Sequence, residues 1–359
     1  MSFGAEHFAN KLLAEAYRQS CSDIHLLPRG EEMIIQFRIQ GELVLHRSLP
    51  NSSGERLISH FKFKASLDIG EKRKPQSGSF EHFIEDCVLS LRISTLPASS
   101  FTESLVLRLL PQSLSIPIEK LSMFSNSAKR LLSLVHHSHG LLLFTGPTGS
   151  GKTTTLYSLV HYCSTTLNRN IITLEDPIER KQDHILQVQI NERAGITYAS
   201  GLRAVLRHDP DMIIVGEIRD AETAKIAARA ALSGHLVLST LHARNAKGAI
   251  YRMHELGVSL QELNQTLIGV TAQRLVKINQ VIPNENLGAR ASVFEMISGK
   301  ELQDILKEKS PGHPTPSLKQ LMRKGVALGY VSEKEYDRWM ANEVDDTPLG
   351  ASYLSKTTW

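Results

Sequence analysis

The sequence predicts an α/β protein with a small mixed N-terminal domain followed by a larger domain built on a parallel sheet. Short β-prone runs surround helical segments at first, whereas strands alternate with helices from about residue 119. The 359 residues include 41% hydrophobic and 22% charged side chains, which is ordinary globular usage. We therefore expect domains at residues 1–110 and 119–343, a linker at 111–118 and a flexible tail at 344–359.

The first domain is expected to contain an amphipathic opening helix, a second helix and several short strands. Apolar residues at helical spacing place the second helix at residues 55–65. The charged, proline-bearing segment EKRKPQSGS then interrupts the regular pattern, and the prolines and serines of residues 111–117 predict the linker. β-prone runs predict strands at residues 23–27, 33–39, 42–47, 88–95 and 104–110.

The second domain is expected to alternate buried strands with helices. Helices are predicted after Lys152, around residues 201–207 and at residues 221–232. From residue 261 onward the pattern predicts helices, with polar loops at 279–290 and 310–316. The apolar runs that predict strands lie at residues 141–145, 171–175, 212–215 and 236–240.

Charge, cysteine spacing and hydropathy exclude several classes of protein. A net charge of +4 is too small for a protein that coats nucleic acid. Cys21, Cys87 and Cys163 are widely separated and form no CxxC pair, which favours reduced thiols in the cytosol over disulfides or zinc ligands. The longest apolar runs are far shorter than a membrane span, and the chain opens without the pattern of a secretion signal.

A phosphate-binding loop is the most specific local signal. The segment GPTGSGKT fits GxxxxGK[ST], follows the apolar run LLLFT and leads into a predicted helix. Its glycines let backbone N–H groups surround phosphate oxygens, its lysine neutralises the terminal phosphates, and the hydroxyl of Thr153 is a Mg²⁺ ligand. The predicted nucleotide-binding residues are Gly146, Pro147, Thr148, Gly149, Ser150, Gly151, Lys152, Thr153 and Thr154.

Carboxylates follow two later strands at the ends where α/β sheets bind ligands. The strand in ITLEDPIE ends among Glu175, Asp176 and Glu179, and the strand in DPDMIIVGE runs into Gly216 and Glu217. P-loop enzymes typically end the second of these strands with an aspartate for Mg²⁺, so the glutamate is an informative departure. Acids also cap helices and solvate strand ends, and from the residues alone that alternative stays open.

Two histidines bracket the next apolar strand, LVLSTL. His235 precedes it and His242 follows it. Because this strand is expected beside the strand of the P-loop, we predict that both histidines sense phosphate or hold the catalytic acids. A structural role in the core is the alternative.

Four ordered motifs resemble the secretion-type ATPases that drive type II secretion and type IV pilus assembly and retraction. FTGPTGSGKTTTLYSL resembles the family's Walker A motif, ITLEDPIE its aspartate box, LRHDPDMIIVGEIRDAETA its atypical Walker B motif, and SGHLVLSTLHA its histidine box. SDIHLLP, IQFRIQGEL, LDIGEKRKPQSGSF and LRISTLP resemble the domain that precedes the motor domain. The resemblance implies a RecA-like P-loop ATPase domain with a helical C-terminal region.

The resemblance also implies a role for individual residues. Lys152 and Thr153 would hold phosphate and Mg²⁺. Glu179 would orient or deprotonate the attacking water, and Glu217 would assist the metal. By strand propensity Arg92 and Arg108 are outward-facing arginines, but the resemblance implies that they reach toward the nucleotide, where a guanidinium stabilises phosphate charge.

Departures from the family pattern indicate which kind of secretion-type ATPase to expect. The four-cysteine insertion that larger members of the family carry after AQRLV is missing, and we expect no extra N-terminal domain, so we expect ATP and Mg²⁺ but no zinc. The compact form resembles the competence pilus-assembly ATPases of Gram-positive bacteria, which serve DNA uptake. This implies a homohexamer, peripheral on the cytoplasmic face of the membrane, that docks on a polytopic platform protein and acts on pilins indirectly without binding nucleic acid itself.

Three alternative functions stay open at this point. A pilus-retraction ATPase has the same architecture, because the catalytic motifs do not encode the direction of the stroke. A nucleotide-dependent scaffold is disfavoured by the presence of Glu179 and Glu217. A DNA translocase or helicase is disfavoured by the small net charge and the lack of a basic-aromatic array.

Overall fold

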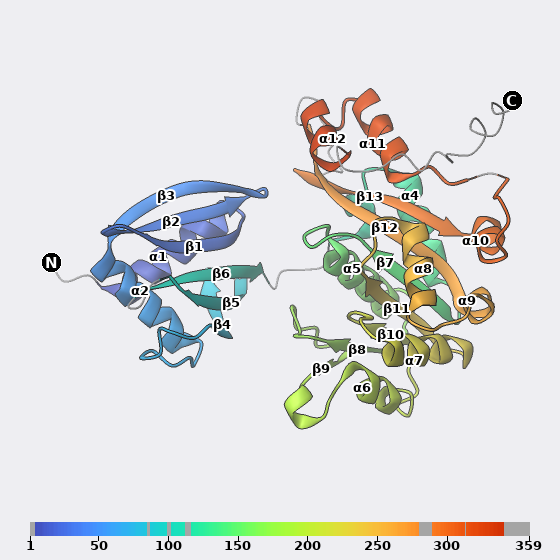
Figure 1. Cartoon of the computed structure of the whole chain (residues 1–359), viewed down its shortest axis with the longest axis horizontal. Helices are drawn as coiled ribbons and strands as arrows, with labels where there is room; N and C mark the ends of the chain where they lie inside the picture. The colour runs from blue at the N-terminus through green and yellow to red at the C-terminus, as the bar shows by residue number, and fades with distance from the viewer. Residues whose placement is uncertain are drawn as a thin grey trace, which may run out of the picture. The chain divides into compact units, whose positions relative to one another are not determined.

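The computed structural model describes residues 4–84, 87–98, 102–111, 116–279, 289–312 and 314–340. Contacts between Cα atoms divide the chain into two compact units, Met1–Ser115 with Ile172–Gly201, and Ile116–Ile171 with Leu202–Trp359. Figure 1 shows the elements of both. Half of the predicted linker, most of the predicted loop at 279–290 and the predicted tail lie outside the described residues.

The N-terminal part of the first unit is an antiparallel sheet that packs against two helices (Figure 1). The sheet has the order β3-β2-β1-β6-β5-β4, and each neighbouring pair is antiparallel. The predicted strands and both predicted helices are confirmed, and β4 is an addition. The elements are α1 (Ala5–Arg18), β1 (Cys21–Arg29), β2 (Glu32–Ile39), β3 (Glu42–Pro50), α2 (Asn51–Lys64), β4 (Gln76–Ile84), β5 (Cys87–Pro97) and β6 (Glu103–Pro111).

Apolar side chains from one face of this sheet and from both helices form a single core. The opening helix contributes Leu12 and Leu13, the second helix contributes Leu57 and Phe61, and all four are at most 1% exposed. These positions recur at helical spacing, which is why the sequence predicts amphipathic helices here. The apolar face of α1 is therefore covered by its own domain.

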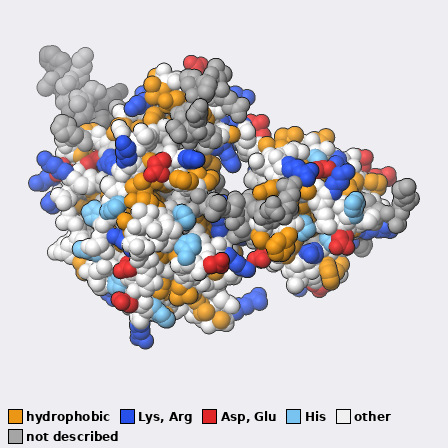
Figure 2. All heavy atoms as spheres, turned by 180° about the vertical axis from the view of Figure 1, so that it is seen from behind, with side chains coloured by type: hydrophobic (Ala, Val, Ile, Leu, Met, Phe, Trp, Pro, Cys, Tyr) orange, Lys and Arg blue, Asp and Glu red, His pale blue; other side chains and the backbone are white. Residues whose placement is uncertain are grey.

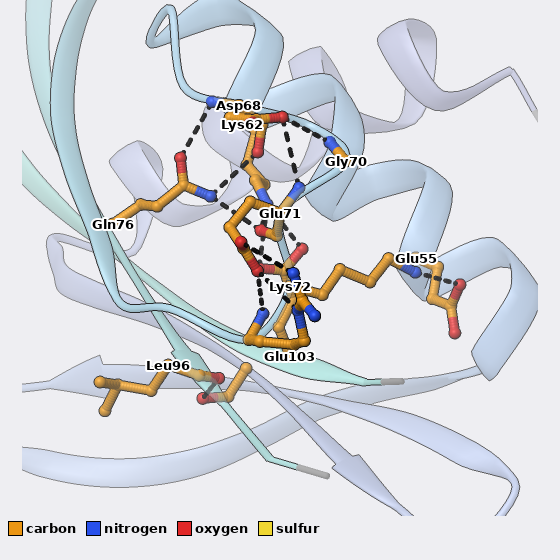
Figure 3. A network of polar contacts seen from close by, with 11 residues as sticks. Glu55, Lys62, Asp68, Gly70, Glu71, Lys72, Gln76, Leu96 and Glu103 are labelled. Atoms are coloured by element: carbon orange, nitrogen blue, oxygen red, sulfur yellow. Dashed lines mark hydrogen bonds and ion pairs between the residues drawn. The ribbon is translucent and has the colours of Figure 1, made fainter. Parts of the chain in front are cut away.

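A buried ion pair ties α2 to the start of β6 (Figure 3). The ammonium of Lys62 donates to both carboxylate oxygens of Glu103, at 3.0 and 3.1 Å, and to the carbonyl of Glu71 at 2.8 Å. Lys62 is 0% exposed and Glu103 is 5% exposed. Gln76 donates to the carbonyls of Asp68 and Glu71, so these contacts fix the charged loop that the sequence places between helix and strand.

Histidines of this sheet and its helices make the first unit sensitive to acid. Burial lowers the pKa of His25, His46, His60 and His82, and Arg38 and Arg108 lower that of His25 further, against an opposing effect of Asp23. The folded unit therefore binds fewer protons than the unfolded chain once the pH falls below the ordinary histidine pKa of about 6.5. The contribution of these neutral histidines to the stability of the unit is fully present above that pH and is lost as the pH falls below it.

We expect the protein to unfold at lower temperature at pH 5.5 than at pH 7.5. The substitution His25→Asn should reduce this difference, because it removes one group that must stay neutral in the folded unit. Differential scanning calorimetry at both pH values tests this expectation. Equal transition temperatures at the two pH values would show that these histidines titrate alike in the folded and unfolded chain.

The second sheet has the order β13-β12-β7-β11-β10-β8-β9. Its pairs β12–β7, β7–β11, β11–β10 and β8–β9 are parallel, while β12 and β13 are antiparallel. The predicted α/β class is confirmed. The remaining strands are β7 (Gly140–Thr145), β8 (Ile171–Glu175), β9 (Leu186–Gln189), β10 (Met212–Val215), β11 (Leu236–Leu241), β12 (Leu267–Lys277) and β13 (Arg290–Ser298).

The remaining helices confirm the three segments predicted between residues 152 and 232. Helix α7 has the predicted bounds, and α6 begins three residues before the predicted 201–207. The helices are α3 (Ile118–Leu121), α4 (Ser125–Val135), α5 (Lys152–Thr165), the short 3₁₀ helix η1 (Glu192–Ala194), α6 (Tyr198–Val205), α7 (Ala221–Leu232), α8 (Ala246–Glu255), α9 (Leu260–Thr266), α10 (Gly299–Leu306), α11 (Leu318–Ala327) and α12 (Glu333–Met340). Within the described residues, none has the length and apolar character needed to cross a membrane.

The prediction of helices from residue 261 onward is wrong for the two strands β12 and β13. Helix α9 ends at Thr266, and β12 continues directly from it. Nearly all of β12 and β13 is buried on both faces, including polar residues such as Thr271 and Gln273, so their sequences lack the alternation that identifies a half-exposed strand. Helices do follow, as α10, α11 and α12.

Candidate functional site

The P-loop connects β7 to α5 in the second unit. Gly151 precedes the helix with φ of 89°, and Gly146 starts the loop with φ of 147°. A β-carbon on Gly146 would lie 2.5 Å from the carbonyl oxygen of Gln273, and one on Gly151 would lie 2.8 Å from the Nε2 atom of the same residue. Only glycine fits at these two positions, and the loop keeps the shape in which backbone N–H groups form an anion site.

Lys152 begins α5 and bends back over the loop. Its Nζ donates to the carbonyls of Gly146 at 2.7 Å and Pro147 at 3.1 Å. Burial lowers the pKa of Lys152, the carboxylate of Glu217 opposes that shift, and the nearby guanidinium of Arg274 adds to it. An ammonium whose charge is disfavoured in this way is strongly stabilised by a phosphate anion.

Hydroxyl groups on adjacent strands fix the segments around the P-loop. The hydroxyl of Thr145 donates to the carbonyl of Ala243 at 2.9 Å and accepts from its N–H at 2.8 Å. The hydroxyl of Thr240 donates to the carbonyl of Gly216 at 2.6 Å, and that of Ser239 donates to the carbonyl of Val215 at 2.7 Å. These bonds align the ends of β7, β10 and β11 beside one another.

Glu217 lies at the carboxyl end of β10 and is held from two sides. Its Oε2 accepts from Arg219 at 2.7 Å, and its Oε1 lies 3.0 Å from Nε2 of His242. The side chain of Glu217 is 17% exposed, whereas those of His242 and Arg219 are 58% and 61% exposed. The structure thus brings His242 to one of the predicted acids, and Arg219 is a contact that the sequence did not indicate.

His235 lies at the other end of β11 from His242. Its Nδ1 lies 3.1 Å from the carbonyl of Ala230 and 3.3 Å from the hydroxyl of Ser233, and its carbonyl accepts from the N–H of Gly140 at 3.1 Å. Gly140 begins β7, so this histidine lies by the amino ends of the strands. The structure therefore does not bring His235 to the P-loop.

Three arginines and one aspartate form a row across the sheet of the first unit. Strand register pairs Arg92 with Arg108, Arg108 with Asp23, and Asp23 with Arg38. Asp23 is 5% exposed, and its oxygens lie 2.8 Å from Nε of Arg108 and 3.8 Å from Nε of Arg38. Two like charges directly opposite each other destabilise a sheet, so this buried carboxylate compensates for the pairing of the arginines.

Arg92 contacts the segment that carries the predicted acid Glu179, and this segment belongs to the same compact unit as Arg92. Its Nη1 lies 3.8 Å from Oε1 of Glu179, and its Nη2 donates to the carbonyl of Pro177 at 3.3 Å. Glu175 instead accepts from Thr173 at 2.6 Å and Gln187 at 3.0 Å. Glu179 is therefore in contact with one of the predicted arginines.

The hydroxyl of Thr153 is an oxygen ligand of the kind that Mg²⁺ binds in proteins. Thr153 is exposed in the first turn of α5, and the described residues contain no group of three or more His, Cys, Asp or Glu side chains that could hold a metal ion. Mg²⁺ usually keeps several water ligands and binds through substrate phosphates and one or two protein oxygens. A threonine hydroxyl beside a P-loop is compatible with that mode of binding.

A P-loop on a parallel sheet, with a glutamate and a histidine in contact at the neighbouring strand ends, defines a P-loop nucleoside triphosphatase. The family described as "Type II/IV secretion system protein" matches residues 4–310. The chain belongs to this family of secretion ATPases and is itself an ATPase. The resemblance drawn from the sequence motifs is confirmed.

Two curated relatives match nearly the whole chain, and a third matches three quarters of it. "Competence protein ComGA" of Bacillus subtilis is 50% identical over 353 residues, which are 95% of this chain and 99% of that protein. "Competence protein ComGA" of Halalkalibacterium halodurans is 44% identical and covers 91% of this chain and 96% of that protein. "Type II secretion system protein E" of Dickeya dadantii is 45% identical over 75% of this chain and 54% of that protein.

Solved structures share the fold. The ATPase DotB of Legionella pneumophila has a TM-score of 0.76 at 23% identity, covering 94% of this chain and 96% of that chain. The pilus retraction motor PilT with bound ADP has a TM-score of 0.67 at 26% identity, covering 92% and 96% of the two chains. The domain pair predicted from the sequence is therefore an architecture found in secretion ATPases.

Proposed function

We propose that this ATPase is the motor that powers assembly of a competence pilus, a type IV-like pilus used in DNA uptake. The observation that carries the proposal is the 50% identity to a competence protein across 95% of this chain and 99% of that relative. A match over both full lengths leaves no large domain of the relative unaccounted for. The larger type II secretion ATPases match over about half their length, as the 54% coverage illustrates.

Residues of the second unit supply nucleotide binding in this proposal. Backbone N–H groups of the P-loop and the ammonium of Lys152 hold the phosphates of ATP. Thr153 and Glu217 are the residues proposed to hold Mg²⁺, which when bound neutralises phosphate charge. His242 and Arg219 fix the carboxylate of Glu217, at 3.0 and 2.7 Å, and so preserve its orientation.

Residues of the first unit supply the proposed hydrolytic step. Glu179 orients the attacking water and accepts its proton, and Arg92 lies 3.8 Å from that carboxylate. Arg108, aimed by Asp23, is proposed to join Arg92 in stabilising phosphate charge. A change of conformation that follows the loss of the γ-phosphate is the basis of a motor in this proposal.

The proposed assembly is a homohexamer on the cytoplasmic face of the membrane. It would dock on a polytopic platform protein and act on pilins through that partner. Lys and Arg side chains are interspersed with Asp and Glu over the face shown in Figure 2, and the net charge is only +4, which supports partners other than DNA. A retraction motor of the same architecture is the second candidate, favoured by the fold shared with PilT.

Mg²⁺-dependent ATP turnover of the purified protein tests the proposal, measured across concentrations that span subunit association and with or without DNA. A motor of this kind gives turnover per subunit that rises with assembly and ignores DNA. Turnover that requires DNA would support a translocase, and turnover by monomers would support a scaffold. A comparison of pili on cells with and without the active protein separates assembly from retraction. Pili need an assembly motor in order to form, but they do not need a retraction motor.

A further inference from the structure

Strand β12 forms the floor of the P-loop. It runs parallel to β7 with Ala272 opposite Thr145, the last residue before the loop. Gln273 follows Ala272 and is 0% exposed. An amide side chain buried at this depth needs hydrogen-bond partners, so its position under the loop calls for an explanation beyond packing.

Gln273 contacts both ends of the P-loop with different atoms. Its main-chain carbonyl occupies the space beside Gly146, and its side-chain Nε2 occupies the space beside Gly151. The two glycines mark the residue where the strand ends and the residue where the helix begins. One residue of a neighbouring strand therefore lies beside both ends of the anion site.

The side chain of Gln273 is itself held in place. Its Nε2 donates to the hydroxyl of Ser292 on β13 at 2.9 Å. Its Oε1 is buried without a hydrogen-bond partner among the described residues, and so is the Oγ of Ser150 in the P-loop. Two buried polar atoms without partners cost free energy, so this region is held together by the contacts that Gln273 does make.

Arg274 fixes the carbonyl of Gln273 from the other side. It is 7% exposed, and its guanidinium donates to the carbonyl of Gln273 at 3.1 Å and to that of Arg244 at 2.9 Å. Arg244 lies two residues after His242 in the sequence. Arg274 thus joins strand β12 to the segment that carries His242, the histidine in contact with Glu217.

We propose that Gln273 is a positioning residue for the nucleotide: its carbonyl and its amide set the spacing of Gly146 and Gly151, and thereby the affinity of the P-loop for the phosphates of a nucleoside di- or triphosphate. Gln273 acts through the loop and does not touch the reacting atoms. It raises ground-state and transition-state binding alike, so its loss affects KM more than kcat.

The substitution Gln273→Met tests the proposal, because methionine keeps the approximate volume but removes the bond to Ser292. We expect the Kd for MgADP and the KM for MgATP to rise about fivefold to tenfold, the effect of one lost hydrogen bond, with kcat changed less than about twofold. Direct titration of MgADP does not require turnover. Wild-type protein that fails to bind MgADP would overturn the ATPase assignment, which is a different outcome from the failure of this inference.

Thr271→Val is the matched control. Thr271 lies on the same face of β12, is also 0% exposed, and has a hydroxyl without a partner among the described residues. It should bind MgADP like the wild type. Gln273→Met binding within twofold of wild type, or a loss equal to that of Thr271→Val, would overturn the proposal.

Ser292→Ala provides a second variant that leaves Gln273 in place. It removes the oxygen that accepts from the amide and should weaken MgADP binding in the same direction. The double variant with Gln273→Met should lose no more affinity than Gln273→Met alone, because both changes break one bond. Additive losses would show that the two residues act separately and would contradict the proposal.

Discussion

The substitution Glu179→Gln is expected to lower kcat for ATP hydrolysis by about 10²–10⁴-fold, the usual contribution of a positioned general base. Glutamine keeps the shape of the side chain and a hydrogen-bond acceptor near Arg92, 3.8 Å from the carboxylate in the structure, but it cannot accept a proton. Nucleotide binding should change little. Steady-state turnover together with MgADP titration separates the two effects.

Lys152→Ala gives the opposite pattern. It removes the ammonium that would neutralise phosphate charge in the ground state, so MgADP and MgATP binding should weaken by at least about tenfold, the scale of a hydrogen bond to a charged group.

Glu81→Gln is a matched control for Glu179→Gln, since Glu81 forms an exposed ion pair with Lys181 at 2.7 Å. Wild-type kcat in Glu179→Gln would show that another group activates the water.

Much of the second domain was predictable because its strands are short buried runs bounded by glycine or charge. The P-loop, β7, β10 and β11 are defined by local sequence alone, and the structure has them at the expected residues. Strand β12 was missed because a strand buried on both faces has no polar alternation. Its length and β-branched content are compatible with either a strand or a buried helix.

The contacts of the site were less predictable than its motifs, because they depend on strand register. The row that places Arg108 between Arg92 and Asp23 exists only once three strands pair in one register. The same is true of Gln273, which acts on a loop more than 120 residues earlier in the chain. His235 and His242 looked equivalent in the sequence, yet a strand separates them and only the second one contacts Glu217.

Glu103→Gln is expected to destabilise the first unit by about 3–5 kcal/mol, the cost of leaving a buried charge without its partner. Lys62 is 0% exposed, so its ammonium cannot turn to water when the carboxylate is removed. This loss is a large share of the roughly 5–15 kcal/mol that holds a typical domain folded. Urea unfolding of the variant and of the wild type measures this loss.

Two comparisons distinguish the buried pair from an ordinary surface contact. Lys72→Gln removes a partly exposed pair with Glu55 at 3.0 Å and should cost less than about 1 kcal/mol. The double variant Lys62→Met with Glu103→Leu should recover most of the lost stability, because it removes both charges together. The carbonyl of Glu71 keeps its bond from Gln76 at 2.9 Å in that variant, so the charged loop stays anchored. A double variant as unstable as Glu103→Gln would show that the loop depends on the ammonium of Lys62 itself rather than on the balance of buried charge.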